Sequence, residues 1–175
     1  MTATLDLKTT EEDICRHFSG RDKPLMKSDE LPDIDRFYLH FITHFSRAEI
    51  SSDFVPFMHD DAVRHNRYMA EENNMVARHF WRIGTAIQGD MWFIDKKSNL
   101  IFHHDHDIEE LDPENFVNLR IDFFGFLQFL FLCKDHEDMP DHENGSEAAR
   151  ENFVRPANKI HPDLLENFPF DCMDS

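Results

Sequence analysis

The chain has 175 residues, with 18 basic and 35 acidic side chains and a formal net charge of −17 at pH 7. A surface this negative repels phosphate backbones and anionic lipid, so we expect neither nucleic acid nor a membrane as a partner. The length fits a single domain, and Phe, Leu, Ile and Val make up more than a quarter of the chain, which is enough for a folded core.

Cysteine usage and the N-terminal sequence indicate the compartment. Cys15, Cys133 and Cys172 are far apart and form no C-x-x-C pair, so they predict neither a disulfide framework nor a zinc knuckle. The first residues contain no basic segment followed by an apolar run, and the most apolar stretch, 123–133, is too short to span a membrane. We therefore expect a cytoplasmic protein.

The first part of the chain predicts helices. Thr9 or Thr10, with an acid three residues later, resembles a capping box that opens a helix ended by Ser19-Gly20. Apolar residues then recur at helical spacing over 34–45, which predicts a helix that faces the core. The polar stretch 60–74 is compatible with a helix but lacks a continuous apolar face.

The middle of the chain predicts a sheet followed by one more helix. Aromatic and β-branched runs separated by turn residues are typical of strands, here at 79–83, 91–95, 100–104 and 115–121. Asp122 then caps apolar residues at helical spacing over 123–131. This order predicts an α+β fold, with a central antiparallel sheet packed by helices.

The C-terminal part differs in composition. Residues 135–175 carry 3 basic and 11 acidic side chains, four prolines and few periodic apolar positions. We therefore divide the chain into one α+β domain, 1–134, and a loosely packed acidic extension, 135–175. Short helices are expected in the extension at 146–154 and 162–167.

The run from His103 to Asp107 contains five potential metal ligands. Strand alternation would place His104 and His106 on one face and the other three on the opposite face. A metal site would need further ligands from elsewhere in the fold. Candidates for those ligands are His79, His136 and His142; the competing interpretation is a strand that runs into a solvated polar loop.

Catalytic motifs are missing from the sequence. No H-E-x-x-H, G-x-S-x-G, P-loop or G-x-G-x-x-G pattern occurs, and only five glycines are present. Cys133, on an aromatic helix face, is more typical of a buried small hydrophobe than of a nucleophile. We therefore predict no enzyme activity, no catalytic residues, no cofactor and no bound metal.

The middle of the chain resembles the SUKH superfamily, which contains bacterial toxin-immunity proteins and fungal cell-wall regulators. Members often show Leu-Pro opening a helix, Ile-Gly and Gly-Asp on strands, an apolar strand that ends in Asp-His-acid, and a late helix with Phe-x-x-Phe-Leu. The corresponding segments here are Leu31-Pro32, Ile83-Gly84, Gly89-Asp90, Leu100-Ile101-Phe102 leading to Asp105-His106-Asp107, and Phe123-Phe124-Gly125-Phe126-Leu127. The Asn-Gly that often follows the first helix is replaced by His44-Phe45-Ser46-Arg47, and 60–74 has the character of an insertion.

The resemblance implies a SUKH-like fold and binding without catalysis. Similar proteins neutralise a toxin by binding it, and toxins that cut nucleic acid tend to be basic, so an acidic inhibitor gains steered association. We expect a basic toxin domain as the partner, and acids near the strand ends as its contacts: Asp90, Asp105, Asp107, Glu109 and Glu110. Two alternatives stay open: a metal-binding protein or metal-dependent enzyme that uses His103–Asp107, and a regulatory or scaffold domain of the same fold. The oligomeric state is not predicted.

Overall fold

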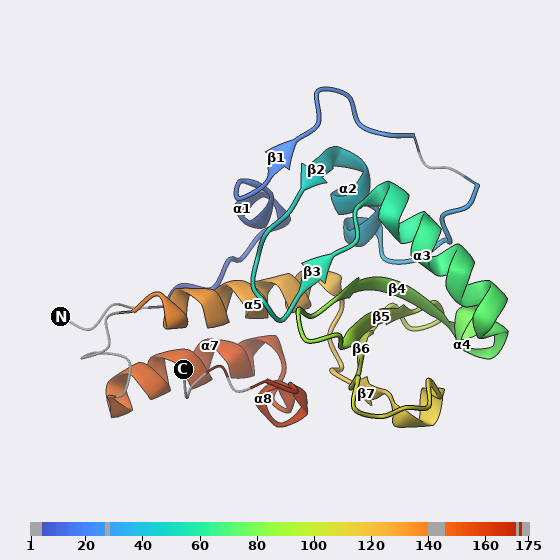
Figure 1. Cartoon of the computed structure of the whole chain (residues 1–175). Coiled ribbons are helices and arrows are strands. Elements are labelled where there is room, and N and C mark those ends of the chain that lie inside the picture. Colours follow the sequence, from blue (N-terminus) through green and yellow to red (C-terminus); the bar gives the residue numbers. More distant parts are fainter. Residues whose placement is uncertain (1–4, 27–28, 140–145, 171, 173–175) are drawn as a thin grey trace.

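The computed structural model describes residues 5–26, 29–139, 146–170 and 172. Its centre is a five-stranded antiparallel sheet in the order β3-β4-β5-β6-β7, flanked by helices (Figure 1). The α+β class with a central antiparallel sheet is therefore confirmed. Among the described residues, none of the helices combines the length and the apolar character that crossing a membrane requires.

The predicted strands in the middle of the chain are present as β4 (Phe80–Thr85), β5 (Met91–Asp95) and β6 (Ile101–His104). A short strand, β3 (Val55–Pro56), pairs with β4 at one edge. The strand expected at 115–121 shrinks to β7 (Val117–Asn118). The chain enters it through a 3-10 turn, η1 (Pro113–Asn115), and the positive φ of 60° at Arg120 interrupts the strand, although the backbones of Leu119 and Ile121 still bond Ile101 of β6.

The N-terminal helix is shorter than expected. Thr10 caps α1 (Glu11–Cys15) by accepting a hydrogen bond from the Asp13 amide. The predicted helix end, Ser19–Gly20, is instead a short strand, β1, which pairs with β2 (Phe45–Arg47). Between these strands the chain forms α2 (Arg36–His44), with Asp35 as its N-cap. The helix predicted at 34–45 is therefore confirmed, with its first turn shifted.

The polar stretch 60–74 folds into α3 (His59–Glu72), and α4 (Asn74–His79) follows at once. The buried face of α3 is narrow and contains Ala62, Asn66 and Met69. The Asn66 amide donates to the Arg82 carbonyl at 2.7 Å, and its side-chain oxygen accepts from the Arg82 N–H at 2.7 Å. One polar side chain thus holds α3 against the part of β4 that β3 does not pair with.

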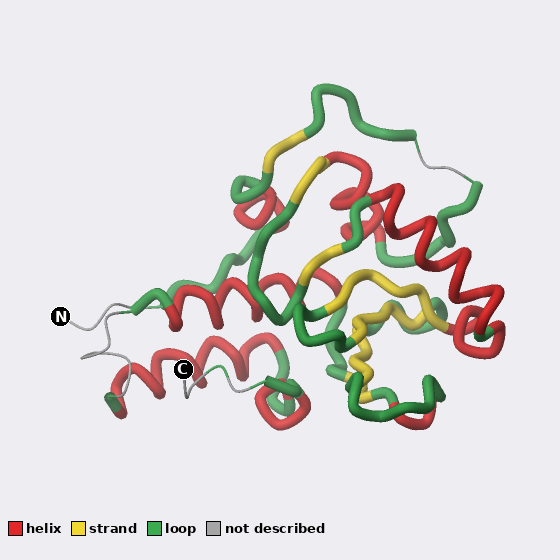
Figure 2. The backbone as a smooth tube through the Cα atoms, in the orientation of Figure 1, coloured by secondary structure: helices red, strands yellow, loops and turns green. Residues whose placement is uncertain are grey.

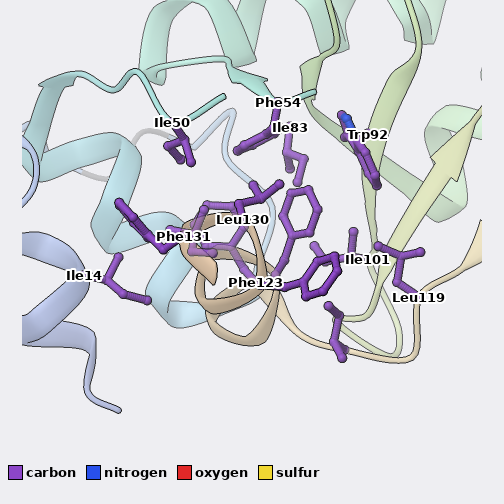
Figure 3. Close-up of a cluster of buried hydrophobic side chains, with 14 of the residues drawn as sticks. Ile14, Ile50, Phe54, Ile83, Trp92, Ile101, Leu119, Phe123, Leu130 and Phe131 are labelled. Atoms are coloured by element: carbon purple, nitrogen blue, oxygen red, sulfur yellow. The ribbon is translucent and has the colours of Figure 1, made fainter. Parts of the chain in front are cut away.

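The late aromatic helix is α5 (Phe123–Glu137), capped by Asp122, whose carboxylate accepts from the Gly125 amide at 2.8 Å. Its side chains are buried on nearly every side, because the sheet lies against one face and α7 (Glu147–Ile160), α2 and α1 contact the helix elsewhere. Figure 3 shows part of this cluster of buried side chains around α5. Phe126 meets Trp92 of β5, with ring centroids 4.7 Å apart. The helix is the centre of the main hydrophobic cluster.

The C-terminal extension is packed, contrary to the expectation from its composition. Residues 146–170 form α7 (Glu147–Ile160) and α8 (Leu164–Asn167), and α7 runs beside α5 (Figure 1). The two largest buried side chains of this segment pack on α5: the ring centroid of Phe153 lies 6.0 Å from that of Phe129, and the ring centroid of Phe168 lies 4.7 Å from it. The loose packing predicted for 135–175 is therefore wrong for the described part, and α5 itself crosses the boundary at residue 134. Residues 140–145 of the extension lie outside the described residues.

His136 provides a test of this packing. It is buried on α5, its ring lies 4.9 Å from that of Phe153, and burial lowers its pKa. The unfolded chain therefore binds this proton more tightly than the folded protein. The stability that the neutral, buried His136 ring contributes is fully present above the ordinary histidine pKa of about 6.5. It is lost as the pH falls below that value.

A His136→Phe variant should lose less stability than wild type when the pH is lowered from about 7.5 to about 5.5, because the buried titrating group is removed. The measurement is the free energy of unfolding at both pH values. The matched control is His79→Gln, at an exposed position. A His136→Phe variant that loses as much stability on acidification as wild type would contradict the assignment.

Candidate functional site

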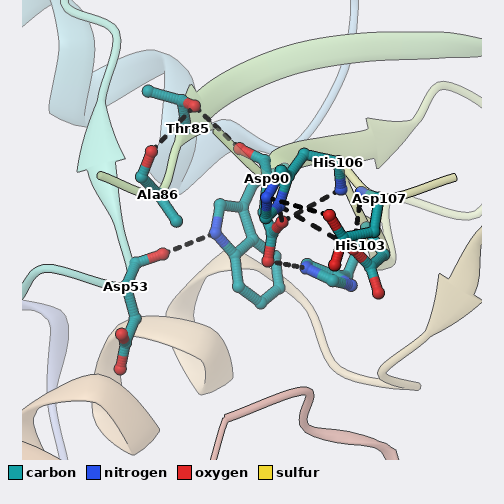
Figure 4. Close-up of polar contacts among 9 residues, drawn as sticks. Asp53, Thr85, Ala86, Asp90, His103, His106 and Asp107 are labelled. Carbon is teal, nitrogen blue, oxygen red and sulfur yellow. Dashed lines mark hydrogen bonds and ion pairs between the residues drawn. The ribbon is translucent and has the colours of Figure 1, made fainter. Parts of the chain in front are cut away.

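Asp90 is the buried centre of the candidate site. It follows the turn 86–89 between β4 and β5 and exposes only 4% of its surface. One carboxylate oxygen accepts a hydrogen bond from His103 Nε2 at 2.9 Å. The other accepts from the His106 backbone N–H at 3.0 Å and from His106 Nδ1 at 2.5 Å (Figure 4). Three donors from the β6 end of the sheet therefore converge on one carboxylate.

The electrostatics of this cluster follow from burial and from these bonds. Burial alone would raise the pKa of Asp90, but the hydrogen bonds from His106 and His103 outweigh it and leave that pKa lowered. Burial lowers the pKa of His103, against the opposing effect of Asp90. The hydrogen bond to Asp90 raises the pKa of His106, and the charge of Asp107 adds to this. Asp90 is thus a carboxylate that pairs mainly with His106.

The turn that carries Asp90 is fixed by its own backbone. The Asp90 carbonyl accepts from the Thr85 hydroxyl at 2.7 Å and from the Ala86 amide at 2.9 Å. Gly89 has φ +115°, a conformation that glycine adopts without strain. A Cβ atom at that position would stand 3.6 Å from the His106 side chain, so the turn and residue 106 lie against each other.

Four acids lie on the loop that follows β6 (in green in Figure 2). We call residues 105–110 the acidic loop; its acids, all exposed, are Asp105, Asp107, Glu109 and Glu110. At one end of the loop, the Asp105 carboxylate accepts from the Asp107 amide at 2.9 Å. At the other end, the His104 ring bonds to the Glu110 carbonyl at 3.1 Å.

A third contact ties the loop to the helices. The Asn73 side chain, between α3 and α4, donates to the Leu111 carbonyl at 2.8 Å. The buried Asp90 carboxylate also fixes the acidic loop, through its hydrogen bonds to the backbone N–H and the ring of His106. The acidic loop is therefore an exposed, negatively charged surface on a fixed support.

The structure corrects one of the five predicted contact residues. Asp90 is buried and its carboxylate is occupied by two histidines, so it supports the loop and is not an exposed acid. Its backbone carbonyl holds the turn, and its side chain reaches across to β6. The other four acids are exposed and adjacent in sequence.

The predicted alternation along His103–Asp107 holds only as far as His104, where β6 ends. The chain then turns, so His106 faces Asp90, as His103 does. His104 lies on the opposite side of β6, with its ring 5.3 Å from Phe116. The sequence could not reveal this, because alternation applies only while the strand continues.

A metal could use part of the cluster. Ligand atoms of Asp90, Asp105 and His106 all lie within 4.8 Å of one another. Two of the additional ligands considered from sequence lie elsewhere. His79 precedes β4 at the far end of the sheet, because Phe80 pairs with Asp95 whereas His104 pairs with Met91, and His136 packs on Phe153. His142 lies outside the described residues.

Two of the three cysteines lie in surroundings that disfavour a nucleophile. Cys133 and Cys172 are both buried in the main hydrophobic cluster. Burial raises the pKa of the Cys133 thiol, and its contact with Cys172 raises it further. A thiol held protonated in apolar surroundings is a poor nucleophile.

Comparisons of the chain with protein families, with curated proteins and with solved structures found no match.

Proposed function

We propose that this protein is a non-enzymatic binding module that meets a basic protein through its acidic loop. The observation that carries the proposal is the arrangement of four exposed acids on a loop fixed from beneath by the buried Asp90. Like charges crowded on one loop repel one another, and a partner rich in Lys and Arg relieves that repulsion. Because the loop is already held in place, binding costs little conformational entropy.

The resemblance to the SUKH superfamily gives this proposal a specific form. We propose an immunity protein with a SUKH-like fold that binds and neutralises a toxin domain of the nuclease type. Such a domain carries a positive surface for its nucleic-acid substrate, and an acidic inhibitor would approach that surface quickly. A regulatory domain of the same fold would use the same surface for a different partner, and the genes beside this one distinguish the two roles.

The test is co-expression with each toxin domain encoded next to the gene. We expect the wild type to restore growth. A variant with the four loop acids neutralised, Asp105→Asn, Asp107→Asn, Glu109→Gln and Glu110→Gln, should restore it poorly while folding normally. Rescue by this variant as complete as that by wild type would remove the acidic loop from the interface. Failure of the wild type against every neighbouring toxin would refute the immunity role.

A second candidate function is metal binding at the cluster of Asp90, Asp105 and His106. The observation that favours it is the mutual distance of their ligand atoms, within 4.8 Å, in a set of one imidazole and two carboxylates that suits Zn²⁺ or Mn²⁺. Elemental analysis of protein purified without an affinity tag tests it. A stoichiometric metal in wild type that is lost in His106→Gln would support this function, whereas metal-free wild type that still binds its protein partner would reject it.

A further inference from the structure

Two isoleucines are exposed on the two segments that Asp90 joins. Ile87, in the turn 86–89, exposes 75% of its surface, and Ile108, in the acidic loop, exposes 39%. Single exposed apolar residues are common on protein surfaces. What distinguishes these two is their place in the fold: Ile108 lies between the acids of the acidic loop, and Ile87 lies in the turn that contacts this loop through Gly89 and His106.

The two isoleucine positions lie near each other in the fold. Gly89 and the His106 side chain lie against each other, since a Cβ atom at Gly89 would be 3.6 Å from His106. Each isoleucine is two residues from this contact, and two residues reach at most about 7 Å. The two positions are therefore close enough for one partner to cover both, since a standard protein interface takes roughly 800 Å² from each partner.

Both isoleucines are also held in position by their backbones. The Ile87 amide donates to the Ser52 carbonyl at 2.9 Å, and the Ile108 amide donates to the Asp105 carbonyl at 3.2 Å. The segments that carry them are joined by Asp90 through His106. Side chains presented in this way lose little freedom when a partner covers them.

We propose that Ile87 and Ile108 are the apolar anchors of the interface, and that the partner is a protein with an apolar pocket bordered by Lys and Arg. This inference rests on the proposed function and adds the residues that hold the complex together. Interfaces commonly place an apolar centre inside a charged rim, and a few central side chains carry most of the binding energy. The four acids of the loop complement the basic border of the pocket.

The acids and the isoleucines then have separable roles. Rim charges act mainly on the association rate and on its salt dependence. Buried apolar anchors act mainly on the dissociation rate, because they contribute only after the two surfaces have met. A kinetic measurement therefore distinguishes the two groups of residues.

The experiment measures association and dissociation rates with the toxin domain that wild type neutralises in the co-expression test. We expect Ile87→Ser with Ile108→Ser to raise the dissociation rate about tenfold or more, while the association rate and its salt dependence stay within about twofold of wild type. The matched control is Tyr68→Ser, because Tyr68 is 63% exposed and belongs to α3, not to the acidic loop or the turn 86–89. Melting temperatures show that all variants fold, and Ile87→Leu with Ile108→Leu should retain slow dissociation.

The possible outcomes separate the proposed anchor residues from the proposed binding function. Unchanged dissociation in the double serine variant, with wild type still binding, overturns the anchors and leaves the proposed function standing. A wild type that binds none of the neighbouring toxin domains overturns both. Faster dissociation in Tyr68→Ser equal to that of the double variant would also place the anchors elsewhere.

Discussion

Replacing Phe126 with alanine should lower the free energy of unfolding by about 2–5 kcal/mol, the usual cost of a large cavity in a packed core. Phe126 is fully buried and lies between Trp92 at 4.7 Å and Phe54 at 5.0 Å. Leu127→Ala, on the same buried helix, should cost a similar amount. Chemical denaturation measures both losses.

The control is Phe124→Ala, two residues before Phe126 on α5. Phe124 is only partly buried and meets Phe37 at 5.7 Å, so its truncation should cost clearly less. Equal losses at the partly buried and fully buried positions, or melting of the Phe126 and Leu127 variants within a degree of wild type, would contradict the placement of α5 in the core.

That helix was predictable from sequence because its cap and its apolar spacing are local signals. Asp122 bonds the Gly125 amide as a capping residue should, and Phe123, Phe126 and Leu130 recur at helical spacing. The same holds for β4, β5 and β6, whose aromatic and β-branched runs are bounded by turn residues.

Elements that depend on distant partners were harder to predict. The buried face of α3 includes Asn66, which hydropathy counts as polar although it bonds both backbone groups of Arg82 on β4. The extension has few apolar residues, yet Phe153 and Phe168 both pack on Phe129. In both cases the stabilising contact joins residues far apart in sequence, so composition and periodicity could not show it.

The candidate site shows the same limit. The four exposed acids could be anticipated because they follow a strand end in sequence. The role of Asp90 could not, because its partners His103 and His106 reach it only through the register that pairs Met91 with His104. The exposure of Ile87 and Ile108 could not be predicted, because no sequence pattern distinguishes an exposed isolated isoleucine in a turn or loop from a buried one.

Replacing Asp90 with alanine should destabilise the protein by roughly 3 kcal/mol, the low end of the penalty for breaking a buried pair, because the His106 side of the pair is partly in solvent. The change leaves the buried His103 ring and the His106 amide without their acceptor. Asp90→Asn should cost less, because its amide oxygen still accepts one of these bonds.

The same variants test whether Asp90 holds the acidic loop. Hydrogen exchange at the His106 amide should become faster in Asp90→Ala than in Asp90→Asn, because that amide donates to the carboxylate. The control position is Asn66→Ala, which removes a buried polar contact between α3 and β4 and should leave the His106 amide protected. Unchanged exchange at His106 in Asp90→Ala would mean that other contacts support the loop.

The central claim is that the acidic loop, rather than net charge alone, attracts a basic partner. The most direct measurement is the association rate with the neutralised toxin domain over a range of salt concentrations. It compares two variants that each raise the net charge by four units. One carries Asp105→Asn, Asp107→Asn, Glu109→Gln and Glu110→Gln; the other carries Glu11→Gln, Glu12→Gln, Glu147→Gln and Glu151→Gln, at exposed positions on α1 and α7.

At low salt the loop variant should associate about 10-fold to 1,000-fold more slowly than wild type, the range over which steering acts, whereas the α1 and α7 variant should stay close to wild type. The difference should shrink towards about 1 M salt, where the screening length is only ~3 Å. Equal slowing of the two variants, or no slowing of the loop variant, would contradict the account.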